Sequence, residues 1–199
     1  MILGEWQGLE AVFKVRKPLR YRLPVLDEAI RRQRTLREAE MIHRAKGARV
    51  ETPYLYDVDL PSSTLVMEHV PGERVKDLIG ASTAEDLEAV FYEFGRNTAR
   101  LHSAGIMHGD LTTANVVRRG GRLVFIDFGL SVWTSRLEDH AVDLRLIKET
   151  LAGAHPDVAA EAMEALSSGY AAVVGGARSR DVLRQLRGIE RRGRYARVS

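Results

Sequence analysis

The pattern of hydrophobic and polar positions predicts several strands near the start of the chain, with one long helix among them. Residues 9–16 predict a strand that ends near Pro18, and two further strands are predicted at residues 54–58 and 64–70. Residues 25–46 predict a charged helix between the first strand and the second. The apolar contacts of this helix are expected from Leu26, Ile30, Leu36, Met41 and Ile42.

A break at Pro71-Gly72 ends the third predicted strand, and we place the hinge between two lobes there. Ser82-Thr-Ala-Glu85 predicts a capping box at the start of the next helix. Gly120-Gly121 predicts a short hairpin that sets Asp127 at a strand end, and the chain from about Leu137 onward predicts further helices. The residues at helical spacing after the capping box are Leu87, Val90, Phe91, Phe94 and Leu101.

Two short motifs carry the chemistry of the chain. The first is His-Gly-Asp-Leu-Thr-Thr-Ala-Asn at residues 108–115, and the second is Asp-Phe-Gly at residues 127–129. Kinases use this spacing for a catalytic aspartate that meets a hydroxyl or water, and for two residues that hold magnesium on ATP. The pattern gives these roles to Asp110, Asn115 and Asp127. Oxygen ligands suit a hard ion that keeps several of its waters.

The first part of the chain offers the other groups that a kinase needs. Lys14 lies inside an apolar strand, where a lysine needs a partner, and in kinases that partner is nucleotide phosphate together with a helix glutamate. Glu38 is the expected glutamate, with Glu40 as the second choice. Main-chain groups of Glu68 and Val70, at the hinge, are expected to hydrogen-bond adenine.

Length and composition exclude several other classes of protein. The chain has 199 residues, of which 45% are hydrophobic, and only about seventy follow the Asp-Phe-Gly motif, so the C-terminal lobe of a full-size protein kinase does not fit. Without cysteine there is no disulfide or thiolate metal site. No apolar run has membrane-spanning length and the N-terminus lacks a signal-peptide pattern, so we expect a cytoplasmic protein without a membrane partner.

Positive charge is unevenly placed along the chain, although the net charge is only +3. One cluster of basic residues lies between Lys14 and Arg37, and a second closes the chain. Arginine meets phosphate oxygens with paired hydrogen bonds, and release of counterions adds affinity. We therefore expect the second cluster to contact nucleic acid, through Arg187, Arg191, Arg192, Arg194 and Arg197.

Taken together, these motifs resemble the small atypical kinase subunit of the KEOPS complex, the archaeal and eukaryotic machinery that makes threonylcarbamoyladenosine on tRNA. The resemblance extends over nearly the whole chain and includes the arginine-rich end. Its segments are Lys14-x-Arg16, Tyr21-Arg22, Arg34-Thr-Leu-Arg-Glu38-Ala, Met67-Glu68, residues 108–115, Asp127-Phe-Gly-Leu-Ser131 and Glu138-Asp-His-Ala-Val-Asp143-Leu.

The resemblance implies an α+β, compact two-lobed protein-kinase-like fold. Residues 1–70 would form a small N-lobe with an antiparallel sheet and one long helix, and residues 71–199 a truncated, mostly helical C-lobe with a basic tail. The implied activity is that of an atypical serine/threonine kinase and ATPase, which uses Mg²⁺ and ATP. The implied partners are the threonylcarbamoyl-transfer subunit of KEOPS, a small accessory subunit and tRNA.

The resemblance implies a role for each residue that matches the family's motifs. Lys14 and Asp110 would be catalytic, with Lys14 contacting the nucleotide phosphates and Glu38 orienting it, while Asn115 and Asp127 would bind magnesium. Asp143 would brace the catalytic loop or be an ordinary helix-surface acid. His108 is expected to be a structural hydrogen-bonding residue, because Asp110 already has the role of base.

One departure from the family pattern concerns the N-terminus. Members normally begin with a strand and a short glycine-containing loop over the ATP phosphates, before the lysine strand. Here Gln7-Gly8-Leu-Glu-Ala11 resembles that loop but lies only a few residues before Lys14. We therefore expect residues 4–8 to form the turn into the lysine strand, with the first strand and the phosphate loop missing or shortened.

Three alternatives remain at this point. A small-molecule kinase of the aminoglycoside or choline type shares the catalytic motif, but normally needs a larger helical C-lobe. A RIO-like kinase shares the compactness, but usually replaces Asp-Phe-Gly with another metal-aspartate pattern, so residues 127–129 argue against it. A non-catalytic scaffold that binds tRNA and KEOPS subunits could also retain a kinase fold. Turnover of ATP separates the scaffold from the enzymes.

Overall fold

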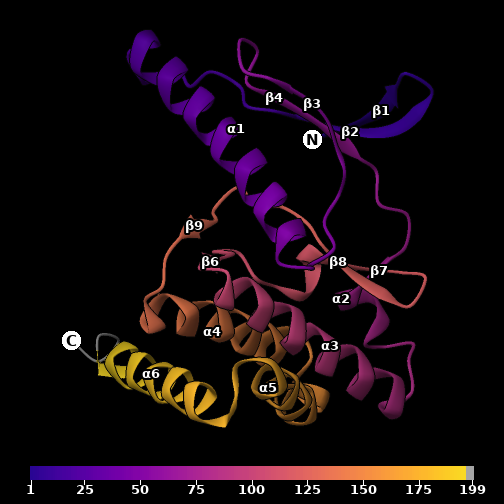
Figure 1. The fold of residues 1–199 in the computed structure, drawn as a ribbon, viewed down its shortest axis with the longest axis vertical. Coiled ribbons are helices and arrows are strands. Elements are labelled where there is room, and N and C mark those ends of the chain that lie inside the picture. Colours follow the sequence, from indigo (N-terminus) through magenta and orange to yellow (C-terminus); the bar gives the residue numbers. More distant parts are fainter. Residues whose placement is uncertain (196–199) are drawn as a thin grey trace.

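A four-stranded antiparallel sheet forms the first part of the molecule. The computed structural model describes residues 1–195, with side chains described as far as Arg192. Strands β1 (Ile2–Trp6), β2 (Leu9–Val15), β3 (Leu55–Asp59) and β4 (Thr64–Glu68) pair in the order β1-β2-β4-β3. Figure 1 shows this sheet together with the long helix α1 (Pro24–Gly47), which descends from it toward the rest of the protein.

Two smaller sheets follow and frame the central motifs. Strands β5 (Glu73–Arg74), β7 (Val116–Arg119) and β8 (Arg122–Phe125) form an antiparallel sheet, and β6 (Ile106–Met107) pairs with β9 (Val132–Trp133). The 3-10 turn η1 (Thr113–Asn115) precedes β7. The segment 108–112 therefore leaves β6 and enters η1, while Asp127 follows β8, so one end of these short strands presents both motifs.

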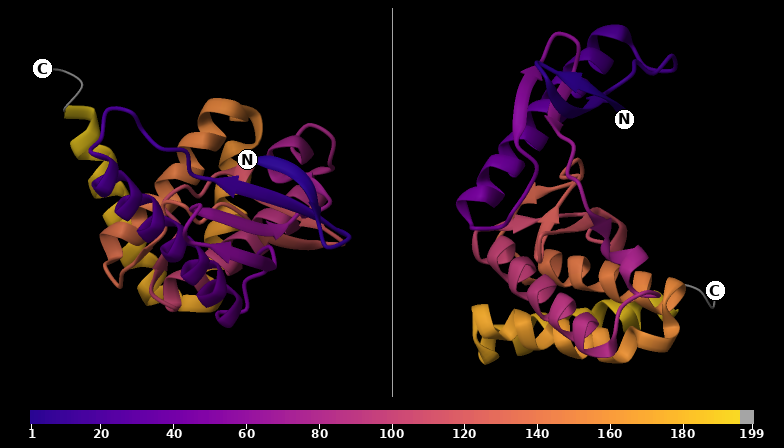
Figure 2. Two further views of the ribbon diagram at one scale, coloured as in Figure 1. Left: turned by 90° about the horizontal axis from the view of Figure 1, so that it is seen from above. Right: turned by 90° about the vertical axis from the view of Figure 1, so that its right-hand side faces the viewer.

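Helices make up the remainder of the molecule. They are α2 (Val75–Leu78), α3 (Ala84–Ser103), α4 (Leu137–Ala154), α5 (Ala159–Val174) and α6 (Gly176–Tyr195), with the 3-10 turn η2 (Pro156–Val158) before α5. Seen from the side, the helices form a layer opposite the four-stranded sheet and α1 (Figure 2). No helix within residues 1–195 is long and apolar enough to cross a membrane.

Hydrophobic burial is very unequal in the two layers. The main core contains residues of α3 to α6 and the short strands, with Phe91, Phe94, Phe125 and Phe128 at most 1% exposed. The C-terminal half of α1 joins this core through Met41 and Ile42. The separate cluster under the four-stranded sheet has only Ala39, Leu65 and Met67 as buried members. The sheet therefore has little apolar support of its own.

Most elements that the sequence predicted are confirmed, with ends that shift by one or two residues. Strands β2, β3 and β4, helices α1 and α3, the β7–β8 hairpin and the helices from Leu137 onward all form. The predicted capping box is one residue out of place, because Thr83 caps α3 by accepting a hydrogen bond from the Asp86 N–H at 3.2 Å. The lobe division at residue 70 stays a proposal.

The expectation that the first strand is missing is wrong. Residues 2–6 form β1, which pairs directly with β2, and Gln7-Gly8 is the two-residue turn between them. Both turn residues have positive φ, 50° for Gln7 and 81° for Gly8, which is the backbone that a tight hairpin requires. Because such a turn needs only two residues, no longer loop separates the strands.

Candidate active site

Three charged residues that lie far apart in the sequence meet at the boundary between the two layers. The Lys14 ammonium, on β2, lies 2.7 Å from Glu38 Oε1 on α1 and 2.6 Å from Asp127 Oδ1, which follows β8. Burial would raise the pKa of Asp127, but the Lys14 ammonium and the Gly129 N–H hold that pKa below its usual value. Asp127 is therefore a carboxylate. Glu40 is exposed, so the second choice of partner for Lys14 is not used.

Arg16 is part of this ion-pair network, and the sequence analysis did not include it among the site residues. Its guanidinium pairs with Glu38 Oε2 and donates to the Thr35 hydroxyl at 3.3 Å. The Glu38 side chain is 1% exposed and is held between Lys14 and Arg16. The sequence did contain a signal for Arg16. It lies two residues after Lys14, and residues two apart on an extended segment face the same side.

The catalytic-loop aspartate is fixed by its neighbour in the same motif. The Asn115 amide donates to the main-chain oxygen of Asp110 and to Asp110 Oδ2, both at 2.8 Å. These bonds use the NH₂ group of Asn115 and leave its amide oxygen as an acceptor. One carboxylate oxygen of Asp110 is thereby held, while the residue stays partly exposed and accessible.

A buried aspartate braces the same loop from below. Asp143, on α4, accepts hydrogen bonds from the main-chain N–H groups of His108 at 2.7 Å and Gly109 at 2.8 Å. This settles the question that the sequence left open, since Asp143 is fully buried rather than a surface acid. Gly109 has φ 83°, and a Cβ there would lie 2.4 Å from the Leu130 carbonyl oxygen, so only glycine fits.

His108 has a structural environment, as expected. Its ring is buried, with Nε2 3.2 Å from the Ile126 carbonyl oxygen and Nδ1 accepting from the Asp110 N–H at 3.3 Å. Burial lowers the pKa of His108, so the ring is neutral. In that form Nε2–H donates to Ile126, and both ring nitrogens are used in holding the loop.

A cavity of about 340 Å³ opens between the two layers beside these groups. Its lining includes six of the residues predicted to form the nucleotide site. Four of them have charged or amide side chains, and two lie at the hinge. Asp110 is not among the residues that line it. Apolar side chains such as Val12, Met67 and Ile126 form part of its wall. The six predicted residues are Lys14, Glu38, Glu68, Val70, Asn115 and Asp127.

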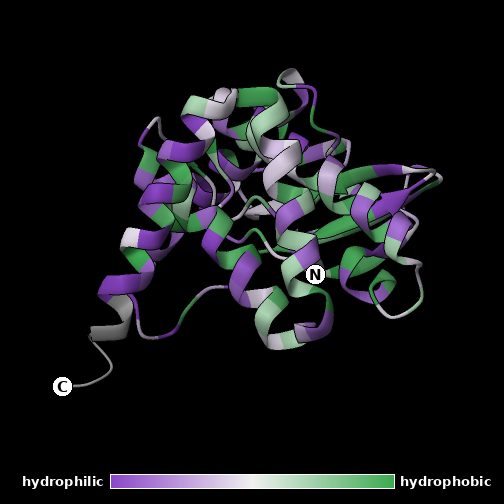
Figure 3. Ribbon diagram, turned by 90° about the horizontal axis from the view of Figure 1, so that it is seen from below, coloured by the Kyte–Doolittle hydropathy of each residue, from purple (hydrophilic) through white to green (hydrophobic). Residues whose placement is uncertain are grey.

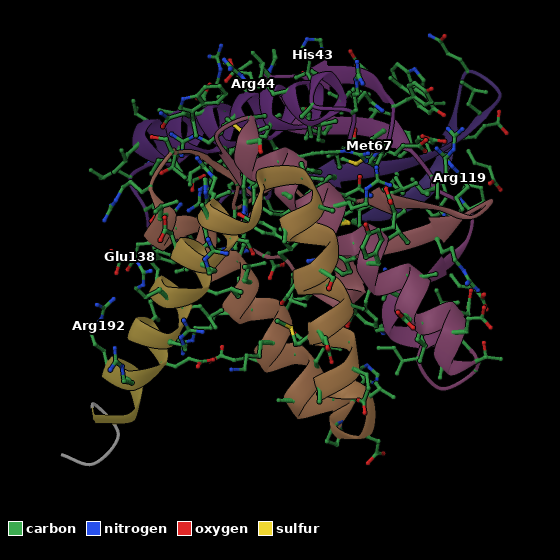
Figure 4. All side chains as sticks on the ribbon, turned by 60° about the horizontal axis from the view of Figure 1, so that its bottom comes forward. His43, Arg44, Met67, Arg119, Glu138 and Arg192 are labelled. Atoms are coloured by element: carbon green, nitrogen blue, oxygen red, sulfur yellow. The ribbon has the colours of Figure 1, made fainter. Side chains whose placement is uncertain are left out.

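One main-chain donor at the hinge is already used within the protein. The N–H of Glu68 already donates to the Tyr54 carbonyl oxygen at 2.8 Å, and the Glu68 side chain pairs with Arg119. Met67 and Arg119 are labelled in Figure 4. Within the described part of the chain, the Val70 N–H has no hydrogen-bond partner. Val70 is thus the residue with a free donor for a ligand.

The donor set fits a magnesium ion that shares its coordination with phosphates. No group of three or more His, Asp or Glu side chains within the described residues could hold a metal alone. The Asn115 amide oxygen and the Asp127 carboxylate are hard oxygen ligands on the same cavity. Mg²⁺ characteristically takes one or two protein ligands and completes its shell with water and phosphate oxygens.

The basic residues near the C-terminus lie on α6. Arg180, Arg184, Arg187 and Arg191 are exposed and recur at helical spacing, so they share one face. Figure 3 shows hydrophilic segments alternating with hydrophobic ones along this helix. Arg192 pairs with Glu138 on α4 at 2.7 Å, and the two are labelled side by side in Figure 4. The side chain of Arg194 and all of Arg197 lie outside the described residues.

Comparison with known proteins identifies the family that the chain matches and several similar relatives. The sequence pattern of the RIO domain matches residues 20–148. The KEOPS complex subunit Bud32 of Pyrococcus abyssi is 39% identical over 187 residues, covering 94% of this chain and 85% of that protein. A probable bifunctional tRNA threonylcarbamoyladenosine biosynthesis protein of Methanothermobacter thermautotrophicus is 41% identical over 192 residues, 96% of this chain but 34% of the relative. The chain thus spans about a third of that longer protein.

A solved structure supports the expected fold. The Rio2 kinase of Chaetomium thermophilum, in complex with ADP/Mg²⁺ and phosphoaspartate, aligns over 98% of this chain and 70% of its own, with TM-score 0.61 and 15% identity. The two-layer α+β kinase-like fold is confirmed. The argument from Asp127-Phe-Gly against a RIO-like kinase is wrong, because the RIO-domain pattern matches this chain. Phe128 is 1% exposed in the core, so its identity reflects packing. Of the three motif residues, Asp127 is the one that lines the cavity.

Proposed function

The chain belongs to the RIO-domain family and, within it, to the Bud32 group of KEOPS subunits, and from this premise we propose that it binds magnesium-ATP between its two layers. We propose that it acts there as an atypical serine/threonine kinase and ATPase. The observation that carries this proposal is that one cavity is lined by Lys14, Glu38, Asn115 and Asp127, which come from β2, α1, η1 and the segment after β8.

Each polar group of the cavity has a role that its contacts support. When bound, ATP supplies the phosphoryl group, and magnesium offsets the charge on its phosphates. Lys14 contacts the phosphates while Glu38 holds its ammonium in place, and Asn115 with Asp127 offers the metal-facing oxygens. The Val70 N–H and the Glu68 carbonyl oxygen bind adenine, against the apolar wall.

Asp110 acts on the acceptor. Its carboxylate, held by Asn115 through Oδ2, orients a substrate hydroxyl or a water and accepts its proton. The loop that carries Asp110 is fixed by the bonds of Asp143 to His108 and Gly109. Positioning of this kind supplies much of the catalysis in phosphoryl transfer, because the protein does little covalent chemistry.

The proposal includes the assembly in which the reaction would be used. Since relatives carry the names KEOPS complex subunit Bud32 and tRNA threonylcarbamoyladenosine biosynthesis protein, we propose that this chain serves threonylcarbamoyladenosine formation on tRNA in the cytoplasm. Its partners would be the threonylcarbamoyl-transfer subunit and a small accessory subunit. The exposed arginines of α6 would contact tRNA, together with Arg192, Arg194 and Arg197.

Turnover tests the proposal and separates it from a scaffold that only binds tRNA. Magnesium-dependent ATP hydrolysis is measured for the purified chain alone, and with a KEOPS transfer subunit and tRNA, beside Asp127→Ala. Hydrolysis that rises with the partner and disappears in the variant is expected. Absence of hydrolysis under every condition, with intact tRNA binding, would favour the scaffold. Phosphorylation of an aminoglycoside in preference to protein would instead favour a small-molecule kinase.

A further inference from the structure

A chain of buried hydrogen bonds connects helix α5 to the catalytic loop. The Tyr170 hydroxyl, on α5, lies 2.9 Å from Nδ1 of His102 on α3. Nε2 of His102 lies 3.1 Å from Oδ2 of Asp143, the carboxylate that holds the main-chain N–H groups of His108 and Gly109. All of these contacts are away from solvent, since Tyr170, His102 and Asp143 are at most 1% exposed.

Proton positions in this chain of contacts follow from burial. Burial would raise the pKa of Asp143, but the bonds from His102 and from the loop N–H groups hold that pKa below its usual value, so Asp143 is an acceptor only. Burial raises the pKa of Tyr170, so its hydroxyl keeps its proton. Because Asp143 only accepts, Nε2 of His102 carries the proton of that contact, and the Tyr170 O–H donates to Nδ1.

A second histidine holds the same ring from its face. His140, on α4, stacks on His102 with ring centroids 4.2 Å apart and 5° between the planes. Burial lowers the pKa of His140 to about 4, and the neighbouring His102 adds to this effect. His140 is therefore neutral near pH 7. The His102 ring is thus fixed by a face contact and by a hydrogen bond at each nitrogen.

We propose that Tyr170 is a positioning residue for phosphoryl transfer, acting through His102 and Asp143 on the main chain that carries Asp110. The hydroxyl selects the ring proton position that lets His102 donate to Asp143. Asp143 then keeps both oxygens directed at His108 and Gly109, and the loop keeps Asp110 in place. This inference rests on the proposed function for its kinetic consequence, but its structural consequence can be measured without turnover.

Removing the hydroxyl alone tests the proposal. Tyr170→Phe keeps the ring in the core and leaves His102 Nδ1 without its donor. We expect kcat for ATP hydrolysis, measured with the transfer subunit and tRNA present, to fall roughly five- to fiftyfold while KM for ATP stays unchanged. Tyr92→Phe, which removes a hydroxyl from a half-exposed tyrosine on α3, is the matched control and keeps the wild-type kcat.

Two further variants distinguish positioning from loss of stability. Ile147→Val removes one methylene from the core beside Asp143 on α4 and lowers thermal stability without touching the hydrogen bonds. Asp143→Asn interrupts the chain of contacts at its loop end. We expect Tyr170→Phe to lower kcat well beyond Ile147→Val, and to lower it little further in the Asp143→Asn background. Equal loss in Ile147→Val, or additive loss in the double variant, would overturn the proposal.

Amide hydrogen exchange keeps this test independent of the proposed activity. In the full chain, the His108 and Gly109 amides are expected to exchange at least about tenfold faster in Tyr170→Phe than in Ile147→Val, with buried amides of α3 unchanged between the two. If the wild type shows this protection but no ATP turnover, the proposed function fails while the coupling stands. Equal exchange of the two loop amides in both variants would refute the coupling itself.

Discussion

The two layers of the molecule hold the candidate site in different ways. Asp110, Asn115 and their loop are fixed by hydrogen bonds that end on Asp143, above a large apolar core. Lys14 and Glu38 come from a layer whose own buried cluster is three residues, and ion pairs hold them in place. One half of the site is held by hydrogen bonds anchored on a packed core, and the other half is held by ion pairs.

This difference has a consequence for ligand binding. A bound nucleotide brings negative phosphates to Lys14, which at present contacts both Glu38 and Asp127. The ion pair between Lys14 and Asp127 also links the two layers directly at the cavity. We therefore expect magnesium-ATP to order the four-stranded sheet and α1, and to change the catalytic loop little.

The largest expected effect is on the packed layer. In α5, a Cβ at Gly169 would lie 1.9 Å from the Tyr92 carbonyl oxygen on α3, and the reciprocal contact at Gly95 is equally close. Gly169→Ala must push two backbones apart and should cost at least about 3 kcal/mol of unfolding free energy. Denaturant unfolding measures it. Gly188→Ala on α6, where the added Cβ meets nothing within 4 Å, is the control and should be neutral or stabilising.

The second-largest effect is expected from acid, which should lower the folding stability of the packed layer. Burial lowers the pKa of His140 to about 4, against roughly 6.5 in the unfolded chain, so the unfolded state binds more protons between these values. Stability should therefore fall as pH drops below about 6.5 and level off below about 4, by at most about 3 kcal/mol. His140→Gln should remove much of this slope in unfolding measured from pH 7 to 5. An unchanged slope would contradict the assignment.

A smaller effect is expected where charge holds the site. Glu38→Ala leaves Lys14 and Arg16 without their shared carboxylate and should cost about 2 kcal/mol, together with a roughly tenfold higher KM for ATP. Glu40→Ala, on the same helix but exposed, should change neither quantity. If the two variants behave alike, the ion-pair network does not support the site.

The smallest effect is expected on the outer face of α6. Arg187→Ala and Arg191→Ala should each weaken tRNA binding a few-fold and reduce the salt slope by about one, without changing ATP binding. Arg96→Ala, which removes a partly exposed arginine paired with Glu93 on α3, is the control. Filter binding at low and high salt gives the tRNA affinity and its salt slope. Equal salt slopes for all three variants would argue against a contact between α6 and tRNA.

Sequence reasoning reached the motif residues because their roles are tied to short patterns. Asp110 and Asn115 are five residues apart, and Asp127 follows a recognisable hairpin. The pairing of Lys14 with Glu38 was also predicted, since a lysine in an apolar strand needs a partner. These inferences depend on local spacing and on the cost of burying charge.

Other features needed the folded structure. The contact between Tyr170 and His102 joins α5 to α3 across 68 positions of sequence, and no spacing rule predicts it. The β1 strand was missed because a two-residue turn requires positive φ at Gln7, a residue that rarely adopts it. The availability of the Val70 donor likewise depends on which hinge groups the neighbouring strands use.

Hydrogen exchange with and without magnesium-ATP tests the central claim most directly, because it reports on both layers at once. The account predicts that ATP slows exchange in β2, β4 and α1 by tenfold or more, while the His108 and Gly109 amides change little, and that Asp127→Ala abolishes the response. Equal slowing in both layers, or none in the four-stranded sheet, would contradict a site completed by the nucleotide.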